Sequence, residues 1–176
     1  MELLISEEKI QQRVSALAKQ ISKDFRGREV LLIGVLKGSI IFMADLSRKL
    51  KTPVKMDFVR LASYGSGTRS SGEVQLTLNL ETSLRDKDVL VVEDIIDTGI
   101  TLQYLLRRLK ARRPKSLRVV ALLDKPGRRQ VELKVDYIGF RIEDRFVVGY
   151  GLDYAEQFRN LPGIYAIESI EGGSSR

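Results

Sequence analysis

The sequence contains no cysteine and no histidine, and both absences narrow the chemistry available to the chain. Without cysteine there are no disulfides and no thiolate nucleophile. Without histidine the chain lacks the usual general base and the commonest zinc ligand. Any catalysis must therefore depend on carboxylates, hydroxyls, lysine, arginine, backbone dipoles or a hard cation bound through oxygen.

Long hydrophobic runs are also missing, and none approaches the roughly 20 residues that a helix needs to span a bilayer. The first nine residues carry Glu2, Glu7 and Glu8 instead of a basic segment followed by an apolar one. We therefore expect no secretory signal and a cytoplasmic protein. The 176 residues are 43% hydrophobic and 30% charged. This predicts a single globular domain over residues 1–171 and a disordered tail over 172–176.

The formal net charge is +7. A basic balance favours anionic partners, either nucleic acid or small phosphorylated ligands. A basic, solvated surface without a partner is the alternative, and charge alone leaves these interpretations open.

Apolar patterns predict strands that alternate with helices. Apolar residues recur at helical spacing from Ile10 to Ile21, with Ser6 as the N-cap and Gly27 just past the helix end. The other predicted elements are strands at 29–36, 54–61, 73–80, 88–92 and 116–123, and helices at 39–50 and 98–111. Short strands and loops are expected after residue 131. The alternation indicates an α/β fold, a mainly parallel sheet covered by helices on both faces.

The stretch from Ala62 to Gly72 is rich in glycine and serine and lies between two predicted strands. Long loops inside compact domains are often functional. We expect a flexible catalytic loop over residues 62–72 that closes over a bound substrate.

The segment from Val89 to Thr101 combines a buried strand, two acids and the start of a helix. Glu93 and Asp94 follow the apolar run, and buried carboxylates are costly unless they bind something, such as sugar hydroxyls or a hard cation. Residues 97–101 (Asp-Thr-Gly-Ile-Thr) open the helix with backbone N–H groups and two hydroxyls that suit a phosphate. A simple N-cap and a solvated acidic loop are the structural alternatives. The whole thirteen-residue string favours a functional site.

This segment resembles the signature that binds 5-phosphoribosyl 1-pyrophosphate (PRPP) in type I phosphoribosyltransferases. The variant Val-Glu-Asp-Ile-Ile-Asp-Thr-Gly is similar to that of the hypoxanthine-guanine phosphoribosyltransferases. The resemblance implies the type I phosphoribosyltransferase fold with a small hood lobe. It continues in the same order through Leu36-Lys37-Gly38, Ser63-Tyr64, Asp124-Lys125-Pro126, Asp136–Phe140, Phe146–Asp153 and Phe158-Arg159.

The resemblance implies an activity and its partners. The chain would transfer the phosphoribosyl group of PRPP to hypoxanthine or guanine, giving IMP or GMP and pyrophosphate, with Mg2+ as cofactor. Relatives form dimers or tetramers, so a homodimer or homotetramer is expected.

Roles around the sugar phosphate follow from the same resemblance. Asp97 would be the catalytic acid or base that faces N7 of the purine. The 5-phosphate would lie against Thr98, Gly99, Ile100 and Thr101, although several relatives have lysine where this chain has Ile100. Glu93 and Asp94 would hold the ribose hydroxyls and help to bind magnesium. Asp153 would ligate a second magnesium ion.

The remaining implied roles concern pyrophosphate, the lid and the base. The residues implied are Leu36, Lys37, Gly38 and Arg159 for pyrophosphate, with a cis peptide between Leu36 and Lys37; Ser63 and Tyr64 for closure over the reaction centre; and Lys125, Phe146 and Val147 for the purine. Lys125 would donate to the 6-oxo group, Phe146 would stack on the ring, and the Val147 backbone would contact its edge. The structural alternatives are a plain core residue for Phe146, an exposed turn residue for Lys125, a solvated loop residue for Tyr64 and a surface charge for Arg159.

Three other functions compete with this one. A phosphoribosyltransferase-fold regulator that binds RNA through a basic face is compatible with the net charge of +7. An enzyme of the same fold that prefers xanthine or another base is the second. The third, an inactive subunit, fits poorly with the complete set of acids.

Overall fold

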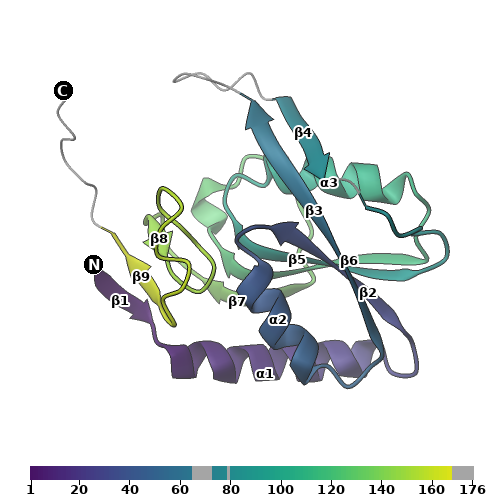
Figure 1. Cartoon of the computed structure of the whole chain (residues 1–176), viewed down its shortest axis with the longest axis horizontal. Coiled ribbons are helices and arrows are strands. Elements are labelled where there is room, and N and C mark those ends of the chain that lie inside the picture. Colours follow the sequence, from purple (N-terminus) through teal and green to yellow (C-terminus); the bar gives the residue numbers. More distant parts are fainter. Residues whose placement is uncertain (65–72, 79, 168–176) are drawn as a thin grey trace.

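The computed structural model of the protein describes residues 1–64, 73–78 and 80–167. Its main feature is a six-stranded sheet in the order β4-β3-β2-β5-β6-β7 (Figure 1). Five of these strands, β3, β2, β5, β6 and β7, run parallel to one another, whereas β4 pairs antiparallel with β3. The strands are β2 (Val30–Leu36), β3 (Val54–Tyr64), β4 (Glu73–Leu78), β5 (Asp88–Ile96), β6 (Ser116–Asp124) and β7 (Tyr137–Arg141).

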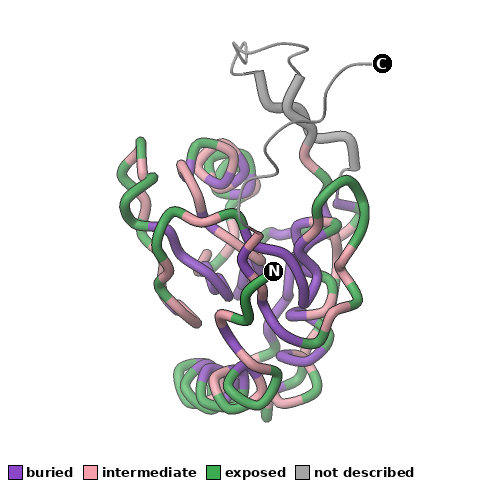
Figure 2. Tube along the Cα trace, turned by 90° about the vertical axis from the view of Figure 1, so that its left-hand side faces the viewer, coloured by how far each residue is buried: buried purple, intermediate pink, exposed green. Residues whose placement is uncertain are grey.

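Helices cover both faces of the sheet, which confirms the predicted α/β class. The helices α1 (Glu7–Asp24) and α2 (Ile40–Lys49) lie on one face, and α3 (Ile100–Lys110) lies on the other (Figure 1). Successive strand residues point to opposite faces. Leu32 of β2 therefore joins the core under α1 and α2, and its neighbour Leu31 joins the core under α3. Figure 2 shows these buried segments in the middle of the molecule, with exposed segments around them.

A second, small sheet joins the two ends of the described chain. Its strands are β1 (Glu2–Ile5), β8 (Val147–Val148) and β9 (Ile164–Ala166), and they pair antiparallel in the order β1-β9-β8. This sheet lies beside the carboxyl ends of the main strands (Figure 1). It corresponds to the hood lobe that the resemblance implied, but its first strand was not predicted from the sequence.

Local sequence accounts for the long helix α1. The Ser6 hydroxyl accepts a hydrogen bond from the backbone N–H of Lys9 at 3.4 Å and so caps the first turn. The apolar positions from Ile10 to Ile21 are buried, as their spacing predicts. Gly27 follows the helix end with a φ of 73°, a conformation that glycine adopts with little strain.

Several predicted boundaries were wrong by a few residues. The strand expected over 88–92 continues to Ile96, because its pairing with β6 extends to that residue. The acids Glu93 and Asp94 therefore lie within β5 instead of after it. The strand expected over 54–61 continues to Tyr64 through its pairing with β4. The helix expected from Thr98 begins at residue 100.

Two other predictions lie partly or wholly outside the described residues. Because β3 reaches Tyr64, only residues 65–72 of the predicted loop are left, and these are not described. The same holds for the tail at 172–176. Within the described ranges, no helix is both long enough and apolar enough to cross a membrane.

Candidate active site

Three strand ends bring most of the predicted site residues to one edge of the main sheet. Leu36 ends β2, Glu93 and Asp94 lie near the end of β5, and Lys125 directly follows β6. Ligands of open parallel sheets bind at this edge. The peptide bond between Leu36 and Lys37 is cis, as the resemblance implied.

The connection from β5 to α3 encloses a cavity of about 250 Å³, lined by residues 93–99, Thr101 and Leu102. Gly99 is the N-cap of α3 and has a φ of 84°, which favours glycine. The Thr98 hydroxyl accepts a hydrogen bond from the N–H of Ile100 at 3.4 Å. The first N–H groups of a helix have no partner within it and carry partial positive charge, so this cavity suits a phosphate.

Two acids border the cavity in an environment that disfavours their charge. Burial and, secondarily, the charge of Asp94 hold the pKa of the Glu93 carboxyl well above its ordinary value. The Glu93 Oε2 atom is buried and has no hydrogen-bond partner among the described residues. Burial also raises the pKa of Asp94 to about 6, against the hydrogen bond from the Ile95 N–H and the charge of Arg159. Such carboxylates are suited to a ligand that brings hydroxyls or positive charge.

Two glycines allow Asp94 to lie against the loop after β2. A Cβ atom on Gly38 would stand 1.5 Å from the Asp94 Oδ2 atom, so no other residue fits there without displacing the acid. On the other side, a Cβ on Gly151 would stand 2.1 Å from the Gly38 carbonyl oxygen. Gly151 has a φ of 102°. Sequence reasoning did not select Gly151 as a site residue.

The cations predicted to hold pyrophosphate contact acids in this structure. The Lys37 ammonium lies 2.6 Å from a carboxylate oxygen of Glu156. The Arg159 guanidinium lies 2.8 Å from Asp153 and 3.4 Å from Glu156, and it donates to the Gly151 carbonyl at 2.8 Å. The structure thus brings together Lys37, Arg159 and Asp153 as expected. Glu156 was missed, although it lies in the same short segment as Asp153.

The predicted catalytic acid or base, Asp97, is paired with an arginine. The Arg128 Nε atom donates to Asp97 Oδ1 at 3.0 Å, and the Asp97 side chain is 43% exposed. Asp144 lies 3.5 Å from the Arg128 guanidinium and 3.6 Å from the Lys125 ammonium. Lys125 itself is only 8% exposed, which argues against an exposed turn residue. Neither Arg128 nor Asp144 was selected from the sequence.

Val147 begins β8 in the hood, and Phe146 directly precedes it. The Phe146 side chain is 51% exposed, so it is not part of the core. Its ring meets that of Tyr154 edge to face, with centroids 5.6 Å apart. A half-exposed aromatic ring in the hood is available for stacking.

The two residues predicted to close over the reaction centre, Ser63 and Tyr64, lie where the chain enters the loop before β4. Ser63 and Tyr64 form the end of β3, opposite Val74 and Glu73 of β4. Their side chains lie outside the description, so their role in closure stays a prediction.

Comparison with known proteins identifies the family. A model described as "Phosphoribosyl transferase domain" matches residues 4–155. The chain belongs to the phosphoribosyltransferase family. This phosphoribosyltransferase is 49% identical over 162 residues to the hypoxanthine-guanine phosphoribosyltransferase of Bacillus subtilis (strain 168), covering 92% of this chain and 90% of that protein. The Staphylococcus aureus (strain N315) protein of the same name is 47% identical over 163 residues, with coverages of 93% and 91%.

Some relatives are longer. The phosphoribosyltransferase is 50% identical over 162 residues to the bifunctional protein TilS/HprT of Listeria monocytogenes serovar 1/2a, and it covers 25% of that protein's length. Among solved structures, a hypoxanthine-guanine phosphoribosyltransferase from Bacillus anthracis superposes with a TM-score of 0.91 at 48% identity, covering 96% of this chain and 99% of that one. These matches confirm the family resemblance and the fold.

Proposed function

We propose that this phosphoribosyltransferase transfers the 5-phosphoribosyl group of PRPP to hypoxanthine or guanine, giving IMP or GMP and pyrophosphate. The names of the relatives of comparable length support the choice of base. The observation that carries the proposal is the cavity of about 250 Å³ at the end of β5, bordered by the buried carboxyl of Glu93 and the half-buried carboxyl of Asp94. A ribose phosphate supplies both a phosphate for the amides of α3 and hydroxyl donors for the carboxylates.

The reaction breaks the bond between C1 of the ribose and pyrophosphate and forms a bond from C1 to a purine nitrogen. The transition state has oxocarbenium character, as at other sugar centres, and no enzyme nucleophile is required. Lys37 and Arg159 stabilise the charge on departing pyrophosphate. They can do so once phosphate oxygens replace the carboxylates of Glu156 and Asp153, which contact them in this structure.

The base occupies the space between the hood and the ends of β5 and β6. Phe146 stacks on the purine, and the buried Lys125 ammonium donates to its 6-oxo group. Asp97 takes or gives the proton at N7, which is general acid–base catalysis. Because Arg128 donates to Asp97 Oδ1, one oxygen of this carboxylate is already engaged when the purine approaches.

Magnesium fits the donors at this site. Mg2+ usually keeps several waters and is held by one or two carboxylates together with substrate phosphates. Over the described part of the chain, no three acidic side chains gather closely enough to hold a metal unaided. We propose that Glu93, Asp94 and Asp153 contribute carboxylates while PRPP supplies the other oxygens. When bound, the metal offsets the charge that develops on pyrophosphate. The homodimer or homotetramer and the cytoplasmic location stay predictions.

One assay tests the proposal. Pyrophosphate release from PRPP and Mg2+ is measured with hypoxanthine, guanine, xanthine and adenine in turn. We expect turnover with the first two bases, at least about a hundredfold lower kcat/KM with adenine, and no turnover in excess chelator. Turnover with xanthine alone would overturn the base assignment. Absence of turnover with every purine would overturn the proposal that the protein is a purine phosphoribosyltransferase.

A further inference from the structure

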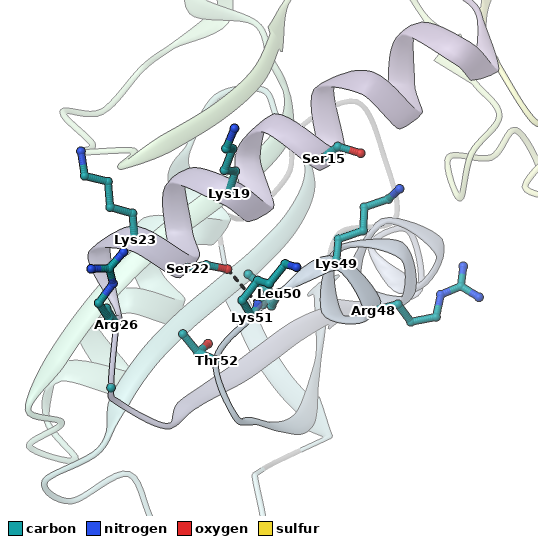
Figure 3. A pocket seen from close by; sticks show the side chains of 11 residues that line it. Ser15, Lys19, Ser22, Lys23, Arg26, Arg48, Lys49, Leu50, Lys51 and Thr52 are labelled. Atoms are coloured by element: carbon teal, nitrogen blue, oxygen red, sulfur yellow. Dashed lines mark hydrogen bonds between the residues drawn. The ribbon is translucent and has the colours of Figure 1, made fainter.

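A second hollow lies at the opposite end of the sheet from the candidate active site. It separates the carboxyl-terminal half of α1 from the end of α2 and the segment that leads into β3 (Figure 3). Its volume is about 950 Å³, which is within the range of small-molecule sites. The strand β2 begins at this end and finishes at the active site. Its seven residues therefore separate the two places by roughly 20 Å.

Every charged side chain that lines this groove is cationic. Within the described ranges only one of these cations forms an ion pair, Arg48 with Asp45. The nearest acid on α1, Asp24, instead contacts Arg118 and the Tyr137 hydroxyl. Apart from Asp45 at Arg48, no carboxylate of the described residues therefore compensates the positive charge that gathers at the groove. The cations are Lys19, Lys23, Arg26, Arg48, Lys49 and Lys51.

Compensation of the helix dipoles explains only part of this cluster of cations. Basic residues are common near helix C-termini because partial negative charge accumulates there. This covers Lys23 in the last turn of α1 and both Arg48 and Lys49 in the last turn of α2. It does not cover Lys19, which lies a turn earlier, whereas Arg26 and Lys51 directly follow the C-cap residues Phe25 and Leu50.

Thr52 provides a second, independent indication of a ligand. It lines the groove, is only 9% exposed, and its buried Oγ1 has no hydrogen-bond partner among the described residues. Buried hydroxyls in proteins nearly always have a partner. Beside it, the Ser22 hydroxyl accepts a hydrogen bond from the Lys51 N–H at 2.9 Å, the dashed line in Figure 3. This bond holds the segment from Lys51 to Thr52 against α1.

We propose that this groove binds the phosphate chain of a linear oligophosphate, either free or as part of a nucleoside triphosphate. Lys19 and Lys23 lie on α1 and Arg26 lies just past its end, while Lys49 and Lys51 line the other side of the groove. Two rows of cations suit an extended anion, and a small displacement of the segment at Thr52 would let its buried hydroxyl donate to a phosphate oxygen. Among the described lining residues none is aromatic, so recognition rests on the phosphates instead of a stacked base.

Chemical-shift mapping of the full-length protein locates the site. Tripolyphosphate is titrated into isotope-labelled protein, and the amide signals of residues 22, 51 and 52 are followed beside those of 98–101. Signals in the first group report the groove, and those in the second report the candidate active site. The result is therefore independent of the proposed enzymatic function. We expect saturable shifts in the groove that weaken as salt is raised, because ionic contacts are screened.

Matched variants test the contacts. Lys19→Glu/Lys51→Glu should weaken groove binding at least about tenfold, and Thr52→Val, which keeps the shape, should weaken it about two- to tenfold. The control Lys9→Glu/Lys110→Glu makes the same change in net charge outside the groove and should bind within about twofold of the parent. Thermal unfolding checks that each variant is folded.

Two further ligands identify the source of the phosphate chain. Equal affinity for ATP and tripolyphosphate supports a site for the chain alone, and tighter binding of ATP supports a nucleoside triphosphate. The proposal is overturned if tripolyphosphate moves only the amides of 98–101, or if the groove and control variants bind equally. It is also overturned if a single-stranded oligouridylate moves the groove amides and tripolyphosphate does not.

Discussion

Gly38→Ala is the substitution whose effect follows most directly from the geometry. The new Cβ atom would stand 1.5 Å from Asp94 Oδ2. The carboxylate must therefore retreat by about 2 Å to reach ordinary van der Waals separation. The backbone of Gly38 cannot move away instead, because Gly151 packs closely against its carbonyl oxygen.

The size of the effect on stability and activity follows from the contacts that Asp94 loses when its carboxylate is displaced. Asp94 loses the hydrogen bond from the Ile95 N–H, now 2.8 Å, which contributes about 0.5–1.5 kcal/mol. Overpacking at a buried position costs about 1–3 kcal/mol. We expect the free energy of unfolding to fall by about 2–4 kcal/mol. We also expect kcat/KM for PRPP to fall by about a hundredfold, because a displacement of this size misplaces the ribose contact.

Urea denaturation at fixed protein concentration and initial rates with varied PRPP measure the two effects. Gly127→Ala is the control, since a Cβ there meets nothing within 4 Å; it should leave both quantities nearly unchanged. Gly38→Ala/Asp94→Ala removes the clash and should regain most of the stability without the activity. If Gly38→Ala matched Gly127→Ala in both assays, the close packing of Asp94 on Gly38 would be wrong.

Three further predictions concern proton transfer, base choice and pH. Asp97→Asn should fold and bind ligands but lose about 10²–10⁴-fold in kcat; turnover within about threefold of the parent would exclude proton transfer by Asp97. Lys125→Met should lower kcat/KM for hypoxanthine and guanine by about tenfold or more while affecting adenine little, and competition kinetics that show equal losses would contradict the contact with the 6-oxo group. Burial raises the pKa of Asp45, but hydrogen bonds from Tyr150, Gln11 and Arg48 outweigh it and hold this pKa below the ordinary 3.8. Folding is therefore stabilised above that pH, and the gain is lost as the pH falls through the lowered pKa. Tyr150→Phe should cost about 1–3 kcal/mol near neutral pH, with a deficit that shrinks in acid; urea titrations that show the same deficit at every pH would refute this.

The sequence was sufficient to predict those parts of the structure that are formed by one continuous segment of the chain. The spacing from Ile10 to Ile21 predicts α1 because helical periodicity and the Ser6 cap are both local. The string from Val89 to Thr101 predicts the acids and the phosphate cavity for the same reason: it contains the strand, the carboxylates and the helix start together. Boundaries were less predictable, because strands end where their neighbours stop pairing, as the extension of β5 to Ile96 along β6 shows.

Contacts between distant segments were decided only by the tertiary structure. The order β2-β5-β6 in the sheet brings Arg128 to Asp97 and places Gly38 between Asp94 and Gly151. The basic groove likewise joins the end of α1 to the end of α2, two segments that are over twenty residues apart. Periodicity and composition describe which side of an element is buried, but they contain no distances between elements. The pairing of strands and the packing of helices across the sheet supply those distances.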